Sequence, residues 1–206
     1  AVWGTLAPVA DDVLRMADDI PVRRISTLLE PQGRAEGNPL RLKENAGIAF
    51  MGDTKGGAFD VPGDVAQRWL ALPLTPNGRP NRDVVRPWVN GLDITRRPRG
   101  MWIVDFGVDM PEHEAAYYEA PFEYVRKHVK PEREKNNRAA YRERWWLHVE
   151  PRSGWREASR DFPRYIGTAR VAKHRLFVYL PANALPDSQV IAFAREKAGD
   201  DAIGEI

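Results

Sequence analysis

The hydrophobic positions of this chain fall mainly in short runs that glycine, proline and polar residues separate. Met101 to Phe106 is aromatic and β-branched, which is typical of a strand buried in a core. Arg164 to Leu180 places apolar positions on either side of a polar turn near Lys173 and His174, and this predicts two paired strands. Ala46 to Met51 predicts a further strand. The pattern therefore predicts a sheet whose strands come from distant parts of the chain.

Other segments repeat their apolar residues at helical spacing. Val65 to Leu72 predicts one helix, and Asp11 to Met16 predicts a shorter one. A longer amphipathic pattern runs from Pro111 to Lys130, where Pro131 ends or kinks it, and resumes from Glu132 to Arg144. Together the elements predict an α+β fold, with a twisted, mainly antiparallel sheet and helices packed on one side of it.

The stretch that precedes the strand at Met101 contains strong turn chemistry. Arg86-Pro87-Trp88 favours an extended backbone, because the residue before a proline is disfavoured in the helical region. Asn90-Gly91 can supply the positive φ of a tight turn. The loop from Arg96 to Arg99 carries three arginines, so we expect it to present positive charge from a rigid base.

The 206 residues are 43% hydrophobic and include 7 Trp, which is enough for a real core in one domain with terminal extensions. Trp145 to Val149 is so bulky and short that we expect a buried strand, or the mouth of one, there. Residues 1–45 are interpreted as an approach segment that follows an upstream domain absent here, because the chain begins at Ala1 and is loose from Pro31 to Pro39. Residues 46–206 form the expected domain.

Composition also limits the compartment. The sequence shows no run of about 18 apolar residues that would span a membrane, and no secretory signal. It contains no cysteine, which removes disulfides and thiolate metal sites and fits a reducing compartment. We therefore expect a cytoplasmic protein.

The formal net charge is only +2, but its distribution is uneven. The segments 79–99, 126–144 and 152–175 carry net charges of +4, +5 and +5, so the rest of the chain must carry −12. Clustered cations of this kind favour a polyanionic partner. The alternative is a solvated surface with internal ion pairs, above all in 126–144, where glutamates alternate with the cations at helical spacing.

Several catalytic motifs are incomplete. Gly52 to Gly57 lacks the Lys and hydroxyl residue that a phosphate-binding loop requires after its second glycine. The four histidines are far apart in sequence, which disfavours a zinc site. Asp53-Thr54-Lys55 resembles part of a nuclease metal motif but has no second carboxylate upstream. Asn38-Pro39-Leu40 only approaches the Asn-Pro-Pro-aromatic motif of DNA amino-methyltransferases.

A set of motifs in a fixed order resembles a known family. The motifs are Phe50-Met51-Gly52, Gly57-Ala58-Phe59, Arg86 to Asp93, Trp102 to Phe106, Glu114 to Tyr118, Trp145-Trp146, Arg164 to Ile166 and Val171 to Phe177. From about Gly47 to its end, the chain resembles the target recognition domain of MmeI-like (type IIL/IIG) restriction-modification enzymes, which are adenine-N6 DNA methyltransferases often fused to a nuclease.

The resemblance implies a module that reads double-stranded DNA and positions the target adenine for a methyltransferase domain of the same parent chain. S-adenosylmethionine would be the cofactor of the parent protein. The methyltransferase and nuclease motifs are missing here, so we expect no catalytic residue, cofactor or metal in this fragment. A metal-dependent nuclease centred on Asp53 and Lys55 and a protein-interaction module remain alternatives.

A duplex reader needs cations for phosphates and a few rigidly held donors for base edges. We expect phosphate contacts from the loop arginines and Lys55, and base contacts between Thr168 and Arg175. The predicted DNA-binding residues are Lys55, Arg96, Arg97, Arg99, Arg164, Thr168, Arg170, Lys173, His174 and Arg175.

Overall fold

The structure is a computed structural model that describes residues 10, 12–17, 19–22 and 46–194. The chain divides into two compact units, Ala1–Glu44 and Asn45–Ile206. In the first unit, β1 (Arg15–Ala17) pairs antiparallel with β2 (Ile20–Val22), so the helix predicted to end at Met16 is wrong. The predicted loose segment from Pro31 to Pro39 lies outside the described residues.

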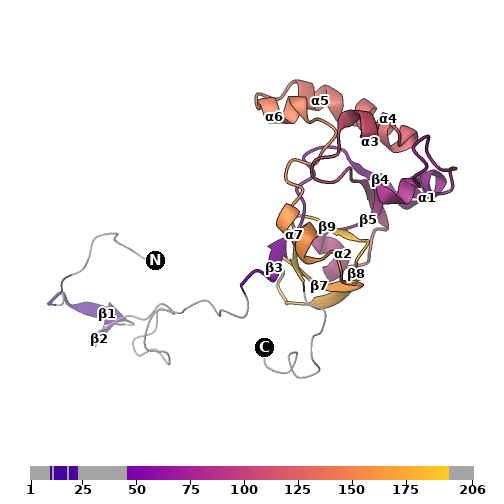
Figure 1. The fold of residues 1–206 in the computed structure, drawn as a ribbon. Coiled ribbons are helices and arrows are strands. Elements are labelled where there is room, and N and C mark those ends of the chain that lie inside the picture. The colour runs from indigo at the N-terminus through magenta and orange to yellow at the C-terminus, as the bar shows by residue number, and fades with distance from the viewer. Residues whose placement is uncertain (1–9, 11, 18, 23–45, 195–206) are drawn as a thin grey trace. The chain divides into compact units, whose positions relative to one another are not determined.

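Two four-stranded sheets form the centre of the second unit (Figure 1). The first contains, in spatial order, β3 (Ala49–Met51), β10 (Val190–Phe193), β7 (Arg164–Ala169) and β8 (Phe177–Pro181), all antiparallel. The second contains β4 (Asp60–Pro62), β6 (Met101–Val104), β5 (Val85–Val89) and β9 (Leu185–Pro186), with only the β5–β9 pair parallel. The predicted mainly antiparallel α+β fold is confirmed, with its strands in two sheets.

The helices of the second unit are short. They are α1 (Gly63–Leu70), the 3-10 turn η2 (Asn81–Asp83), α2 (Gly91–Thr95), α3 (Glu112–Ala115), α4 (Glu119–His128), α5 (Lys130–Glu134), α6 (Ala139–Glu143) and α7 (Ser153–Ala158). Helices α3 to α6 lie together at one end of the unit, and α7 lies by β3 (Figure 1). Pro131 lies in the first turn of α5, where a proline is tolerated. The helical stretch is therefore interrupted after α4, and a new helix begins directly before this proline.

Asn90 begins a helix instead of forming the predicted tight turn. Its side chain accepts a hydrogen bond from the Leu92 backbone N–H at 3.0 Å, and the Asp93 carboxylate accepts one from the Asn90 N–H at 2.8 Å. This reciprocal capping box satisfies two backbone donors at the start of α2. Gly91 has no positive φ.

The main core lies between the second sheet and α4. It buries Ile103 and Val104 of β6 with Phe122 and Val125 of α4, and Trp145 packs at 5.4 Å between ring centroids from Phe122. Residues 145–147 are buried as predicted but form a turn, so the predicted strand there is wrong. A smaller cluster around Trp155 and Tyr165 fixes α7 on the first sheet.

No helix within the described residues is long and apolar enough to cross a membrane.

Candidate nucleic-acid interface

The loop of the β7–β8 hairpin exposes several of the cations that the sequence analysis predicted to bind DNA. Its strands pair from Arg164 opposite Pro181 to Thr168 opposite Phe177, and its loop exposes Arg170, Lys173, His174 and Arg175. The sequence prediction of two strands around a polar turn is confirmed here.

Backbone contacts hold the base of this loop. The Arg170 N–H donates to the Gln189 carbonyl at 2.7 Å, and Arg175 Nη1 donates to the Ala169 carbonyl at 2.6 Å. Val171, at the loop tip, is 83% exposed. The loop therefore projects polar and apolar groups from a hydrogen-bonded frame.

The cations of the hairpin have no carboxylate partners among the described residues. Arg170 donates to the Met51 sulfur, with Nη1 and Sδ 3.3 Å apart, and Arg164 lies 4.2 Å over the Tyr179 ring. Lys173 and His174 make no hydrogen bond or ion pair within that part of the chain. Their positive charge is therefore available to an external anion.

Thr168 does not share this exposure. Its residue is 3% exposed, and its hydroxyl has no hydrogen-bond partner in the described structure. The position does not support the predicted base contact, because both faces of β7 are buried from Gly167 to Ala169.

Helix α2, which directly precedes the arginine segment, packs against β7 of the hairpin. A Cβ on Gly91 would lie only 3.5 Å from Ala169, which directly precedes the hairpin loop. Arg96 and Arg97 are exposed and form no ion pair with a described residue. The fold thus joins the helix that precedes one basic segment to the strand that precedes the other.

Two of the predicted phosphate contacts are instead internal ion pairs. Arg99 donates to the Asp93 carboxylate through Nε at 2.9 Å and Nη2 at 2.8 Å. Burial alone would raise the pKa of Asp93, but the hydrogen bonds from Arg99 and the backbone lower it. Lys55 forms an ion pair with Asp60. These pairs reduce the charge that Arg99 and Lys55 offer to DNA.

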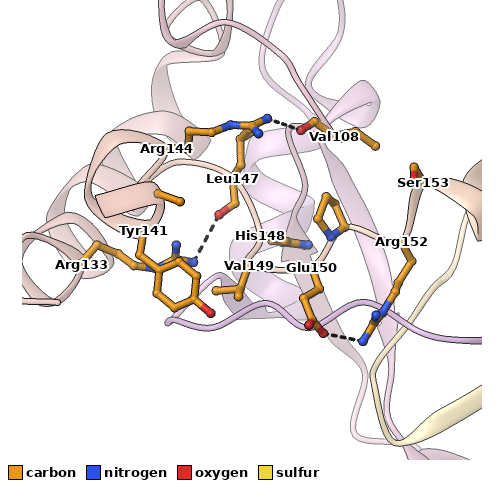
Figure 2. Close-up of a pocket in the computed structure, with 12 residues that line it drawn as sticks. Val108, Arg133, Tyr141, Arg144, Leu147, His148, Val149, Glu150, Arg152 and Ser153 are labelled. Carbon is orange, nitrogen blue, oxygen red and sulfur yellow. Dashed lines mark hydrogen bonds and ion pairs between the residues drawn. The ribbon is translucent and has the colours of Figure 1, made fainter. Parts of the chain in front are cut away.

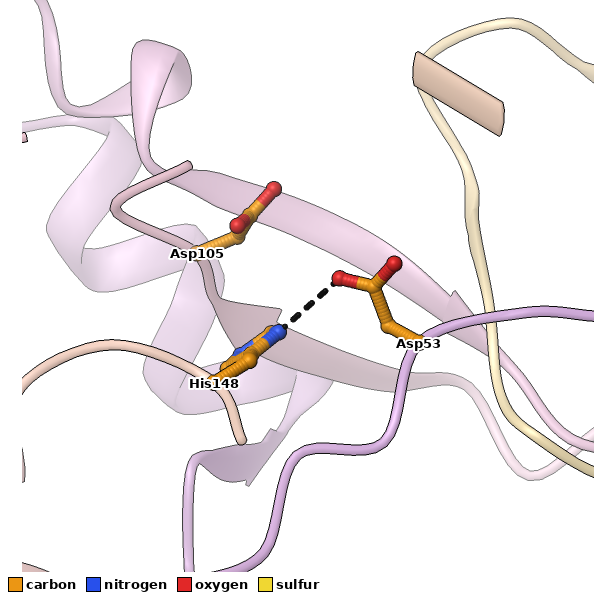
Figure 3. A group of neighbouring side chains, drawn as sticks. All are labelled: Asp53, Asp105 and His148. Carbon is orange, nitrogen blue, oxygen red and sulfur yellow. Dashed lines mark hydrogen bonds and ion pairs between the residues drawn. The ribbon is translucent and has the colours of Figure 1, made fainter. Parts of the chain in front are cut away.

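A second polar group is buried between the sheets. Asp53, Asp105 and His148 each lie at most 5% exposed, and their possible ligand atoms are within 4.8 Å of one another (Figure 3). His148 Nδ1 lies 3.1 Å from the Asp53 carboxylate, and Nε2 lies 3.0 Å from the Val104 carbonyl. Both ring nitrogens therefore lie within hydrogen-bonding distance of an oxygen atom.

Arginines neutralise this group. Arg156 of α7 donates to both oxygens of Asp105, at 2.8 and 2.9 Å, and also to Asp53. Arg86 of β5 donates to Asp105 at 3.2 Å. Burial alone would raise the pKa of Asp105, but Arg156 and His148 outweigh it and hold this pKa well below its usual range.

The three candidate ligands fit a structural ion-pair network better than a metal centre. Two carboxylates already face two guanidinium groups, so a divalent cation would add uncompensated positive charge in a buried place. Asp53 is 0% exposed and bonded to Arg156 and His148, and Lys55 is paired elsewhere. This geometry does not favour the alternative of a nuclease centred on Asp53 and Lys55.

The sequence alone did not identify this network. Asp105 was part of a predicted core strand, and a carboxylate in such a run must find a partner when it is buried. That signal points to a network, but the partners Arg156 and His148 come from segments distant in sequence.

Comparison with known proteins bears on this fold. No protein-family model matches the chain, and no curated protein matches it in sequence. The chain shares its fold with part of MmeI. That solved structure, of a type IIL restriction-modification enzyme in complex with DNA, superimposes with a TM-score of 0.55 at 13% sequence identity. The match covers 90% of this chain and 24% of the MmeI chain, so this chain spans about a quarter of that length.

Proposed function

We propose that this chain is a sequence-specific DNA recognition module of an adenine-N6 DNA methyltransferase or restriction-modification protein. The observation that carries the proposal is the β7–β8 hairpin, whose loop presents Arg170, Lys173 and His174 without a carboxylate partner among the residues that the structure describes. Guanidinium and ammonium groups on a rigid hairpin suit the phosphates and the acceptor-rich guanine edge of duplex DNA. The likeness in fold to MmeI, solved with DNA, supports the same role.

In this proposal Arg96 and Arg97 contact phosphates beside the hairpin, while Arg170 and its neighbours read bases. The parent protein supplies the methyltransferase domain and S-adenosylmethionine, and the target adenine is positioned there. The isolated chain then neither transfers methyl groups nor cuts DNA. In this proposal the protein acts in the cytoplasm.

Fluorescence anisotropy with labelled duplexes tests the proposal. Binding should persist in EDTA and weaken steeply as salt rises, because phosphate neutralisation releases counterions. The variant Lys173→Ala should bind more weakly, and Arg68→Ala should not. Arg68 is a matched control because it is an exposed cation on α1 that is already paired with Asp64 at 2.9 Å.

Sequence preference needs a second measurement. Selection from a randomised duplex pool should enrich one motif for the unaltered chain. Magnesium-dependent cleavage of the pool would instead support the nuclease alternative. Binding to an acidic protein with no affinity for any duplex would support the protein-interaction alternative.

A further inference from the structure

A pocket of about 370 Å³ lies where α5 and α6 meet the segment 147–153 (Figure 2). The charged and hydroxyl-bearing side chains around it are Arg133, Tyr141, Arg144, Glu150, Arg152 and Ser153. The predicted DNA-binding residues do not line it. Three arginines facing one hollow are unusual unless an anion balances them.

Arg133 is a buried cation that forms no ion pair with a carboxylate in the described part of the chain. It is 4% exposed. Its Nε donates to the Gly56 carbonyl at 3.0 Å, and its Nη2 donates to the carbonyls of Lys55 and Leu147 at 3.0 and 3.2 Å. Nη1 makes no hydrogen bond with any residue that the structure describes.

The surroundings of Arg133 fix the guanidinium without neutralising it. Its central carbon lies 5.6 Å from the Phe59 ring centroid and 5.3 Å from that of Tyr141. Burial lowers the pKa of Arg133, and the nearby Tyr141 offsets this effect only in part. A guanidinium held in this way is preorganised for an acceptor that enters the pocket.

The other two arginines add to the same charge. Arg144 Nη2 donates to the Val108 carbonyl at 2.6 Å, and Arg144 forms no ion pair with a described residue. Arg152 pairs with Glu150, which also accepts a hydrogen bond from the Thr54 hydroxyl at 2.9 Å. The pocket therefore holds two uncompensated positive charges, those of Arg133 and Arg144.

We infer that this pocket binds a phosphate group. A phosphate supplies up to two negative charges and several acceptor oxygens, which match the free Nη1 of Arg133 and the remaining donors of Arg144. The group could belong to a DNA backbone or to a free nucleotide. The DNA form of the inference rests on the proposed function, and it adds a phosphate contact on the helical side of the domain.

Nuclear magnetic resonance of the full ¹⁵N-labelled chain tests the inference directly. The arginine Nε–Hε signals of Arg133 and Arg144 should shift and saturate as sodium phosphate replaces sodium chloride at constant ionic strength. Arg144→Gln should weaken phosphate binding about tenfold, as expected for one charge-assisted hydrogen bond. Arg142→Gln is the matched control, because Arg142 lies in α6, which ends directly before Arg144, donates to one backbone carbonyl and does not line the pocket.

A second variant tests the forked geometry of the Arg133 guanidinium separately from its charge. Arg133→Lys keeps the charge but loses the forked geometry, so it should weaken phosphate binding at least as much as Arg144→Gln. If Arg133→Lys does not fold, the Arg144→Gln result decides the inference alone. Equal loss in Arg142→Gln and Arg144→Gln, or signals that respond to chloride and phosphate alike, would overturn it.

DNA binding distinguishes the two sources of phosphate. If the phosphate belongs to a DNA backbone, Arg144→Gln should lower affinity for every duplex by about the same factor and reduce the salt slope by about one. If the phosphate belongs to a free nucleotide, a mononucleotide should bind more tightly than inorganic phosphate does. Arg144→Gln should then leave the affinity for DNA unchanged. Phosphate binding without any DNA binding would contradict the proposed function but would still support a phosphate site in this pocket.

Discussion

Replacing Arg156 with methionine should reveal how much the buried network stabilises the fold. Arg156 bonds to both Asp53 and Asp105, so its loss leaves two buried carboxylates short of a partner. Removal of one partner from a buried pair typically costs about 3–5 kcal/mol. Arg86 and His148 remain in place, so we expect the lower end, about 3 kcal/mol, which corresponds to a fall of roughly 6 to 12 °C in Tm for a protein of this size.

Urea unfolding, followed by tryptophan fluorescence, gives the free energy directly, because Trp155 neighbours Arg156 in the chain. Arg160→Met is the matched control: Arg160 is exposed, and its side chain forms no hydrogen bond or ion pair with a described residue. Its effect should stay within about 0.5 kcal/mol. Combining Arg156→Met with Asp105→Asn should recover part of the loss, since one of the unpaired charges is then removed.

The pH dependence makes this prediction sharper. In the unaltered chain the pKa of Asp105 lies below its unfolded value of about 3.9, so ionised Asp105 stabilises the fold above that pH and this stabilisation is lost as the pH falls through the folded pKa. Without Arg156, burial should dominate and raise the pKa of Asp105 above the unfolded value. The variant then gains stability as the pH falls from 7 towards 4.5.

The difference in unfolding free energy between the unaltered chain and Arg156→Met should therefore shrink on acidification. A difference that stays constant from pH 7 to pH 4.5 would refute the electrostatic explanation. Equal effects of Arg156→Met and Arg160→Met would refute the structural role of the network altogether.

Three further substitutions test other parts of the structure. Gly52→Ala should cost about 3 kcal/mol in urea unfolding, because a methyl group would overlap the carbonyl oxygens of the 186–187 backbone, whereas Gly154→Ala has room and should be neutral or stabilising. Arg97→Ala should weaken binding to all duplexes alike and lower the salt slope by about one; a change in sequence preference would contradict this. Arg170→Glu in the parent enzyme should change the preferred base at one position, with about 1–3 kcal/mol of discrimination; an unchanged methylation site would show that Arg170 is structural.

The local pattern of the sequence determined several elements. The apolar positions from Arg164 to Leu180 specify the β7–β8 hairpin, because strand alternation and turn chemistry act over neighbouring residues. Val65 to Leu72 likewise predicted α1 to within two residues at each end, and Met101 to Phe106 predicted β6. The concentration of cations in three segments is also a property of the sequence alone.

Local pattern was less informative where packing overrides it. The long amphipathic stretch from Pro111 to Arg144 keeps its apolar face but breaks into α3 to α6, because short helices can follow the core around the second sheet. Trp145 to Leu147 is buried as a turn, since bulk predicts burial without fixing the backbone. Asn90-Gly91 has the composition of a turn but forms a helix cap, because Asn is also a favoured N-cap residue.

Only the tertiary structure decided which charges are free. Lys55 and Arg99 are cations like Arg97 in the sequence, yet each pairs with an aspartate, while Arg97 forms no ion pair within the described chain. The network that joins Asp105 to Arg156 brings together residues 51 positions apart. Hydrogen bonds and ion pairs act over a few ångströms of space, so the partner of each charged side chain depends on long-range chain packing that local periodicity does not encode.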